Sequence, residues 1–219
     1  MTARLPRPPR PVWLFDLDNT LHDASPHIFP HINRAMQTYI ETHLQVDAEE
    51  AGRIRQTYWQ RYGATLLGLM RHHDTDPRHF LWETHQFPEL PRMLVFERAV
   101  NAMLGKLPGR KILYSNAPAH YTEAVLDLTG MARHFDAVYP VEATRFQPKP
   151  DPRGLRRLLR AENLQAHQCI LVEDSLPNLR TAKRLGTRTV WISRASRCPP
   201  YVDARLRSVL ELPRYLRQL

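Results

Sequence analysis

The feature that most constrains the fold is a short apolar segment near the start of the chain, Val-Trp-Leu-Phe at positions 12–15, which is followed at once by Asp-Leu-Asp-Asn-Thr. A β-forming run that ends in a polar loop is typical of a buried parallel strand, which delivers residues to its carboxyl end. Four further segments have the same character and predict strands: 111–114, 137–139, 169–172 and 189–192. Helical sequence between these segments predicts an α/β fold with a parallel sheet, and Gly130 and Gly186 are placed as helix stops.

The region 22–92 interrupts this alternation, because its apolar residues recur at helical intervals. Asp47 to Glu50 resembles a capping box that opens one helix, and Asp76-Pro77 predicts the start of another. The sequence therefore predicts a doubly wound, Rossmann-like parallel sheet with a helical cap inserted after the first strand. The predicted division is a flexible basic arm at 1–10, a catalytic core at 11–21 and 93–219, and the cap at 22–92.

Two aspartates, Asp16 and Asp18, follow the first predicted strand. In parallel sheets the functional site lies beyond the carboxyl ends of the strands. Asp16 can attack phosphorus there to form an aspartyl-phosphate. Asp18 can protonate the leaving alkoxide and then deprotonate the water that hydrolyses the intermediate.

A carboxylate that approaches a phosphate dianion needs positive charge, and Mg²⁺ suits an all-oxygen site of this kind. Asp16, the backbone carbonyl of Asp18 and Asp174 can each supply an oxygen, and Glu173 can bind directly or through a water. The predicted cofactor is therefore Mg²⁺.

Two other predicted strand ends supply groups that can bind phosphate. Ser115 can donate a hydroxyl hydrogen bond to a phosphoryl oxygen, with Asn116 or nearby backbone amides assisting. Lys149 stands between two prolines that stiffen its loop, and its ammonium group can neutralise phosphate and nucleophile together.

The ordered sequences DLDNT, SNA, PKP and VEDS, each after a predicted strand, resemble the four-motif signature of haloacid dehalogenase superfamily phosphatases. The resemblance extends over residues 12–192. It implies that Asp16 is the nucleophile and Asp18 the general acid/base. It also implies that Ser115 and Lys149 bind phosphate and that Asp174 with Glu173 forms the metal site. Dehalogenases of the superfamily lack an aspartate at the position of Asp18, so this residue favours phosphoryl transfer.

The predicted cap has its own resemblance, carried by segments 61–69, 76–80 and 84–90, to the pyrimidine 5′-nucleotidase subfamily. This similarity implies hydrolysis of UMP and CMP to nucleoside and phosphate. Six cap aromatics have the chemistry to stack on a base, although aromatics at helical spacing also pack in cores. They are Tyr58, Trp59, Tyr62, Phe80, Trp82 and Phe87.

Other functions stay open at this stage. The same core suits a phosphatase of another small metabolite, such as a sugar phosphate or phosphoglycolate, and it suits a phosphomutase that retains its aspartyl-phosphate. A basic nucleic-acid-binding protein on a catalytically idle fold is the alternative from another class. Eight of the eleven histidines lie between His22 and His85, but their spacing matches no zinc motif. His22, directly after the DLDNT loop, is either a hinge residue or a substrate contact.

The composition agrees with a small-molecule enzyme. The net charge of +9 comes mainly from arginines in helical stretches, where they mark a solvated face, and no nucleic-acid-binding motif accompanies them. The chain has two cysteines, no apolar run long enough to span a bilayer and no signal-like start. The expected partner is therefore a small phosphate ester, with a nucleotide favoured over other esters. No membrane partner is expected, a nucleic acid is disfavoured, and the expected location is the cytoplasm. The sequence does not indicate the oligomeric state.

Overall fold

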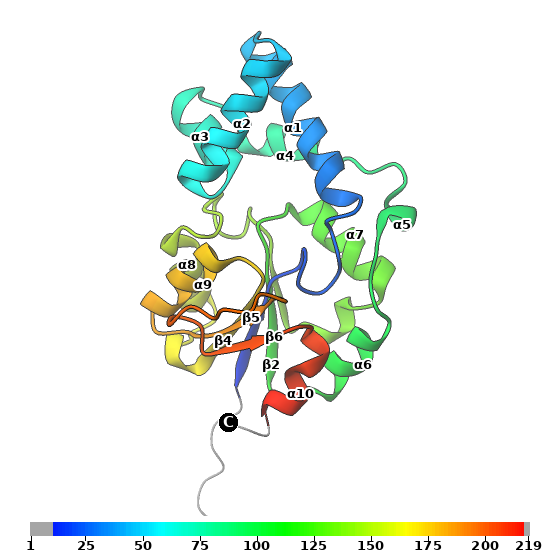
Figure 1. Ribbon diagram of the computed structural model, residues 1–219, viewed down its shortest axis with the longest axis vertical. Helices are drawn as coiled ribbons and strands as arrows, with labels where there is room; N and C mark the ends of the chain where they lie inside the picture. The colour runs from blue at the N-terminus through cyan, green and yellow to red at the C-terminus, as the bar shows by residue number, and fades with distance from the viewer. Residues whose placement is uncertain (1–10, 217–219) are drawn as a thin grey trace, which may run out of the picture.

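A parallel six-stranded sheet forms the centre of the protein, and a group of helices lies above the carboxyl ends of its strands (Figure 1). The computed structural model describes residues 11–216. The order of the strands across the sheet is β3-β2-β1-β4-β5-β6. Their bounds are β1 Val12–Phe15, β2 Arg110–Tyr114, β3 Ala137–Tyr139, β4 Cys169–Glu173, β5 Arg188–Ile192 and β6 Ala204–Leu206. The predicted α/β fold with a Rossmann-like parallel sheet is confirmed.

Strand β1 is central and pairs in parallel with β2 on one side and β4 on the other. Its side chains alternate between the two faces of the sheet, as the period of a strand requires. Trp13 and Phe15 enter one apolar cluster, and Val12 and Leu14 enter a second. Both faces are therefore buried, which explains why this segment is apolar at every position.

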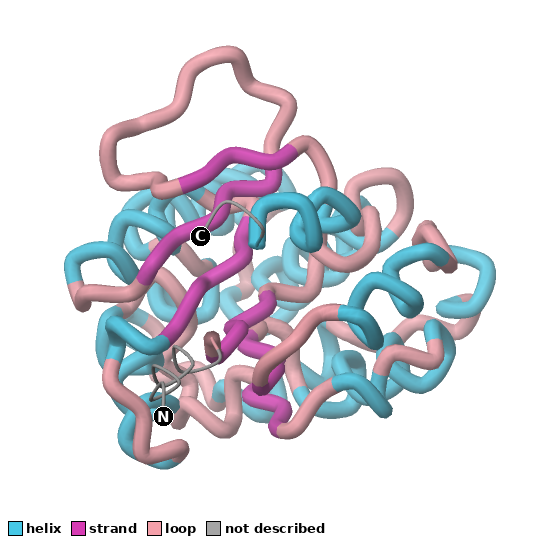
Figure 2. Tube along the Cα trace, turned by 90° about the horizontal axis from the view of Figure 1, so that it is seen from below, coloured by secondary structure: helices cyan, strands magenta, loops and turns pink. Residues whose placement is uncertain are grey.

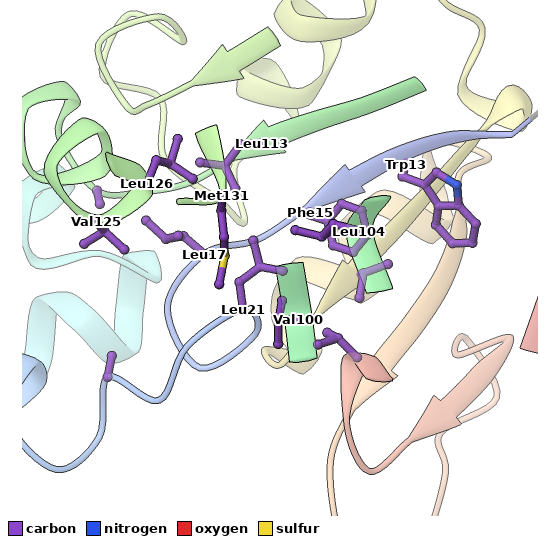
Figure 3. Packing of buried hydrophobic residues seen from close by; sticks show 14 of the residues in the cluster. Trp13, Phe15, Leu17, Leu21, Val100, Leu104, Leu113, Val125, Leu126 and Met131 are labelled. Atoms are coloured by element: carbon purple, nitrogen blue, oxygen red, sulfur yellow. The ribbon is translucent and has the colours of Figure 1, made fainter. Parts of the chain in front are cut away.

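Helices cover both faces of the sheet, so the core has three layers (Figure 2). The cluster around Phe15 packs the sheet against α6, α7 and α10 (Figure 3). The cluster around Leu14 packs it against α8 and α9. The bounds of these helices are α6 Ala99–Lys106, α7 Ala119–Thr129, α8 Pro152–Ala161, α9 Leu176–Arg184 and α10 Leu212–Tyr215. Short 3₁₀ turns lie at Ala132–His134, Ala166–Gln168 and Val209–Glu211.

Helix α8 shows why the chain carries so many arginines. Leu155, Leu158 and Leu159 are buried against the sheet, whereas Arg156 and Arg160 are exposed. The predicted solvated arginine face is confirmed on this helix.

Four helices follow β1 and precede the core helices: α1 Ile28–Leu44, α2 Ala48–Tyr62, α3 Thr65–His72 and α4 Pro77–Thr84. They share an apolar cluster of their own, which includes Tyr39, Ile40, Leu69 and Phe80. The short helix α5, Leu90–Met93, lies on the connection that returns the chain to the core. The predicted domain boundaries, at residues 21/22 and 92/93, stay a prediction.

The predicted helix ends agree with the capping geometry. The carboxylate of Asp47 accepts the backbone N–H of Glu50 at 2.8 Å, and that of Asp76 accepts the N–H of Arg78 at 2.9 Å, with Pro77 in the first turn. Gly130 ends α7 in the left-handed conformation, with φ at 69°. These local signals need no tertiary context, so the sequence alone was sufficient to predict them.

Strand β6 was not predicted: its three half-buried residues show no clear alternation, and it pairs with β5 at the edge of the sheet. The predicted arm at 1–10 lies outside the described residues. Within residues 11–216, no helix has the length and apolar character that a bilayer crossing requires.

Candidate functional site

One cavity of about 480 Å³ lies between the carboxyl edge of the sheet and helices α1–α4. The register of the strands explains what converges there. Phe15 is paired with Leu113 and Val172, so the residues that follow them lie side by side at the strand ends. All seven side chains selected from the sequence line this cavity: Asp16, Asp18, Ser115, Asn116, Lys149, Glu173 and Asp174.

The ammonium group of Lys149 is buried among oxygen atoms. Its Nζ donates to Asp16 Oδ1 at 2.6 Å, to Glu173 Oε2 at 2.8 Å and to the carbonyl oxygen of Tyr114 at 2.9 Å. Burial alone would lower the pKa of Lys149, but the charges of Asp16 and Glu173 more than compensate and raise it. Lys149 is therefore a permanent cation at the point where the first and fourth strands end.

Three carboxylates crowd the same point. Asp16, Glu173 and Asp174 each offer an oxygen within 4.8 Å of the others. Burial, followed by the charge of Glu173, raises the pKa of Asp16 to about 7. Burial, followed by the charge of Asp16, raises the pKa of Asp174 to about 9. These shifts show that the single ammonium group of Lys149 does not balance the carboxylates, and an oxygen donor set of this kind fits a hard divalent cation such as Mg²⁺.

The turn after β1 orients its two aspartates by local hydrogen bonds. Thr20 Oγ1 donates to Asp16 Oδ2 at 2.9 Å. Asn19 adopts the left-handed conformation, with φ at 62°, and its side-chain oxygen accepts the N–H of Ala24 at 2.9 Å. Asn19 and Thr20 therefore hold the turn, while Asp16 and Asp18 line the cavity.

Asp18 has two hydrogen-bond partners, one from a distant helix and one four residues further along the chain. The hydroxyl of Tyr121, on α7, donates to Asp18 Oδ1 at 2.7 Å, and Nε2 of His22 lies 2.9 Å from the same oxygen. Burial would raise the pKa of Asp18, but these two partners stabilise its charged form and lower the pKa overall. His22, left open between hinge and substrate contact, contacts Asp18 in the structure.

Ser115 and Asn116 both line the cavity, but their side chains form different hydrogen bonds. Ser115 Oγ accepts the N–H of Ala117 at 3.0 Å, and no group within residues 11–216 accepts its hydroxyl hydrogen, which can therefore donate to a substrate. Asn116 uses both ends of its amide on the backbone of Lys149: Nδ2 donates to the Lys149 carbonyl at 2.9 Å, and Oδ1 accepts the Lys149 N–H at 2.7 Å. Asn116 therefore positions the lysine loop, a role that the sequence analysis did not separate from phosphate binding.

The cap aromatics named as stacking candidates divide into two groups. Trp59 and Phe80 line the cavity. Phe80 is fully buried in the cap core, whereas Trp59 is 60% exposed. The other four pack elsewhere: Tyr58 and Tyr62 against His72, Trp82 against His120, and Phe87 against Tyr121. Trp82 is also exposed, at 55%, but does not line the cavity, so Trp59 is the candidate that combines an exposed ring with a place in the cavity wall.

The histidines of the cap form no metal site in the part of the chain that the structure describes. The only cluster of three metal-ligating side chains found within residues 11–216 is the carboxylate group at the strand ends. Several histidines instead pair with tyrosines, as His73 does with the hydroxyl of Tyr58 at 2.7 Å.

Contact between α1–α4 and the core occurs next to Lys149. Gly63, at the end of α2, has φ at 79° and lies so close to the ring of Pro150 that a Cβ atom there would overlap it. Only glycine suits both the left-handed backbone and this approach. The α2–α3 turn therefore contacts the loop that carries the lysine.

Sequence reasoning missed several residues of this site because they lie on helices. Tyr121 contacts Asp18, Asn178 donates to Glu173 Oε2 at 3.0 Å, and Arg55 and Asn33 line the cap side of the cavity. The only signal for Asn178 was its place in the first turn of the helix that follows the VEDS strand. The other three give no signal without the packing of their helices.

A family model described as a haloacid dehalogenase-like hydrolase matches residues 12–186. Among curated proteins, the chain is 30% identical over 192 residues to a phosphoglycolate phosphatase of Rhodospirillum rubrum, a match that covers 82% of this chain and 78% of the relative. It is 25% identical over 197 residues to phosphate metabolism protein 8 of Saccharomyces cerevisiae, covering 83% of this chain. That match spans only 61% of the yeast protein's length.

Among solved structures, the fold resembles that of a phosphatase of the same family from Thermococcus onnurineus. The TM-score is 0.66, with 22% sequence identity, and the match covers 94% of this chain and 97% of the other. The likeness extends over the sheet and the helices alike, so it supports the same architecture for nearly the whole chain.

Proposed function

This chain belongs to the haloacid dehalogenase-like hydrolases, and we propose that it is a magnesium-dependent phosphatase of small phosphate monoesters, with Asp16 as its nucleophile. The observation that carries the proposal is the contact of Asp16 with Lys149, at 2.6 Å, beside two further carboxylates and within reach of Asp18 on the same turn. A lone buried carboxylate would repel a phosphate, and this arrangement supplies the charge and the proton donor that phosphoryl transfer needs.

In the first step, a carboxylate oxygen of Asp16 attacks phosphorus, and the bond from phosphorus to the ester oxygen breaks. Asp18 acts here in its protonated form, the minor form in the substrate-free site because Tyr121 and His22 stabilise its carboxylate, and gives that proton to the ester oxygen, so the alcohol leaves neutral. In the second step, Asp18 takes a proton from a water molecule, whose oxygen attacks the aspartyl-phosphate. Inorganic phosphate leaves and the carboxylate of Asp16 is restored.

The remaining residues bind and orient. Lys149 neutralises part of the charge shared by nucleophile and phosphate, and Asn116 fixes the loop that carries it. The free hydroxyl hydrogen of Ser115 is available to a phosphoryl oxygen. Asp16, Glu173 and Asp174, with the backbone carbonyl of Asp18, would hold Mg²⁺, which supplies positive charge to the phosphoryl group when bound.

Pyrimidine nucleoside 5′-monophosphates are the substrates that we propose first. A cavity of about 480 Å³ extends from the carboxylates to the exposed ring of Trp59, so it offers room and a stacking surface beyond the phosphate. The second candidate is phosphoglycolate, because the relative from Rhodospirillum rubrum is named a phosphatase of this compound. A mutase would use the same aspartates but retain the phosphate on Asp16.

The test is the release of inorganic phosphate, with and without Mg²⁺, from a panel of UMP, CMP, AMP, GMP, sugar phosphates and phosphoglycolate. Turnover that needs Mg²⁺ supports the phosphatase, and UMP and CMP well above the purine nucleotides support the nucleotidase. Asp16→Asn should abolish turnover, whereas Asp127→Asn, which changes an exposed carboxylate on α7, should keep it. Substantial activity in Asp16→Asn would overturn the assignment of the nucleophile.

A further inference from the structure

The wall of the cavity formed by α1–α4 differs in charge from the wall formed by the sheet. All the carboxylates that line the cavity come from the core, and most of the cap lining is apolar. His85 lies in the cap wall, but burial lowers the pKa of its imidazole to about 4 and keeps it neutral. Among the described lining residues, Arg55 of α2 is therefore the one charged side chain that the cap contributes.

Arg55 lacks the carboxylate partner that a buried or half-buried guanidinium group usually has. No carboxylate within residues 11–216 forms an ion pair with it. Its Nε atom is buried and has no hydrogen-bond partner among the described residues. The buried Nε is closed to a ligand, but the Nη2 group is not one of the buried atoms and forms no hydrogen bond within residues 11–216, so its two N–H groups are available to one. The backbone at this position is fixed, because Thr65 Oγ1 donates to the Arg55 carbonyl at 3.1 Å.

Within residues 11–216, the side chain of Arg55 forms a hydrogen bond with one other side chain, and this bond makes the surface rich in donors. Its Nη1 donates to Asn33 Oδ1, on α1, at 2.9 Å. A guanidinium group can only donate, so the amide of Asn33 must present its oxygen to Arg55 and its NH₂ group elsewhere. The pair therefore offers N–H groups from both residues, and its acceptor, Asn33 Oδ1, already accepts one hydrogen bond from Arg55.

An aromatic ring lies on the same helix face. Arg55 and Trp59 are four residues apart on α2, a spacing that places both on one side of the helix, and both line the cavity. A flat stacking surface next to several N–H donors suits a planar group with oxygen acceptors at its edge.

We infer that Arg55 and Asn33 form a specificity site that binds the oxygen acceptors at the end of the substrate opposite its phosphate. This inference rests on the proposed phosphatase function. Two sources supply such oxygens: the carbonyl groups of a pyrimidine base and the carboxylate of phosphoglycolate. The exposed ring of Trp59 favours a pyrimidine base as the ligand, and the kinetic comparison below distinguishes the base from the carboxylate.

The experiment compares kcat/KM for UMP, phosphoglycolate and phenyl phosphate, which has a planar ring but no oxygen acceptor opposite its phosphate. Arg55→Met removes the donors and keeps the apolar stem, and Arg55→Lys keeps the charge and loses the planar fork. Arg53→Met is the matched control, because Arg53 lies on the same helix, is exposed and pairs with Glu50 outside the cavity.

In Arg55→Met we expect the ratio of kcat/KM for UMP to that for phenyl phosphate to fall about tenfold or more, the size expected when a charged donor is lost. The ratio should fall less in Arg55→Lys, and it should stay unchanged in Arg53→Met. A fall for phosphoglycolate but not for UMP assigns the acceptor to a carboxylate. Ratios that stay within about threefold for both substrates, or an equal fall in Arg53→Met, would overturn the inference.

Two further measurements separate the possible failures. A wild-type protein that releases no phosphate from these three compounds or from the nucleotides and sugar phosphates named above contradicts the proposed function itself, before any variant is made. The affinity of Asp16→Asn for UMP, measured by calorimetry with and without Arg55→Met, reports binding independently of turnover. Thermal melting of each variant identifies one that fails to fold, and Arg55→Lys then carries the test.

Discussion

Replacing Asp174 by asparagine should change how the stability of the metal-free protein depends on pH. Burial and the charge of Asp16 raise the pKa of Asp174 from 3.8 to about 9 in the folded chain. Between these two values the folded chain holds a proton that the unfolded chain has lost, so the free energy of unfolding falls as the pH rises. Asparagine carries no titrating proton, so the variant should lose this part of the dependence.

The size of the effect follows from proton linkage. One extra proton in the folded state changes the free energy of unfolding by about 1.4 kcal/mol per pH unit, or about 3 kcal/mol between pH 6 and pH 8. For a chain of this size, each kcal/mol shifts the melting temperature by about 2–4 °C. The melting temperature of the wild-type protein in EDTA should therefore fall about 6–12 °C more over this interval than that of Asp174→Asn.

The assay is thermal unfolding by differential scanning calorimetry across this pH range, in EDTA and in Mg²⁺. A cation that replaces the proton should stabilise the wild-type protein more at the higher pH, and it should stabilise Asp174→Asn less, because one ligand is gone. Asp127→Asn serves as the control and should follow the wild-type protein. Parallel curves for the wild-type protein and Asp174→Asn in EDTA would refute the reasoning, because the carboxylates would then not repel one another.

Two further predictions concern contacts around the cavity. Gly63→Ala should lower the free energy of unfolding by about 1–3 kcal/mol, because its Cβ would overlap Pro150, and should lower kcat/KM, because Pro150 adjoins Lys149. Gly130→Ala, with the same left-handed backbone but nothing within 4 Å, should keep its activity, and equal losses of activity in the two variants would contradict the role of the contact. Tyr121→Phe removes a donor that lowers the pKa of Asp18, so the limb of the pH–rate profile due to Asp18 should move to higher pH, and an unchanged or lower limb would contradict this.

The part of the site that the sequence was sufficient to predict is the part attached to strand ends. Asp16, Ser115 and Asp174 each follow a short apolar run, and parallel strands end at one edge of a sheet, so their convergence needs no further information. Lys149 could be included because its loop follows a predicted strand. The structure brings these residues together through the register of β1 with its two neighbours.

The part that could not be predicted depends on how helices pack. Tyr121 reaches Asp18 from a helix more than one hundred residues along the chain, and Arg55 meets Asn33 only because α1 lies against α2. Helical periodicity indicates which face is buried, but not which neighbour that face will meet. The edge strand β6 was missed for a related reason, since its three half-buried residues carry no alternation of their own.

The charges of the cavity also constrain the order of events in the proposed reaction. Asp16, Asp18, Glu173 and Asp174 line the core side with one cation, Lys149, among them. A phosphate dianion adds further negative charge, so it should bind poorly while the metal site is empty, and worse as the pH rises and the shared protons leave. Arg55 lies in the opposite wall and can attract the far end of the substrate without neutralising the carboxylates. On this reasoning the cation must bind before or with the phosphate, and the cap arginine contributes to selecting the substrate rather than to activating the nucleophile.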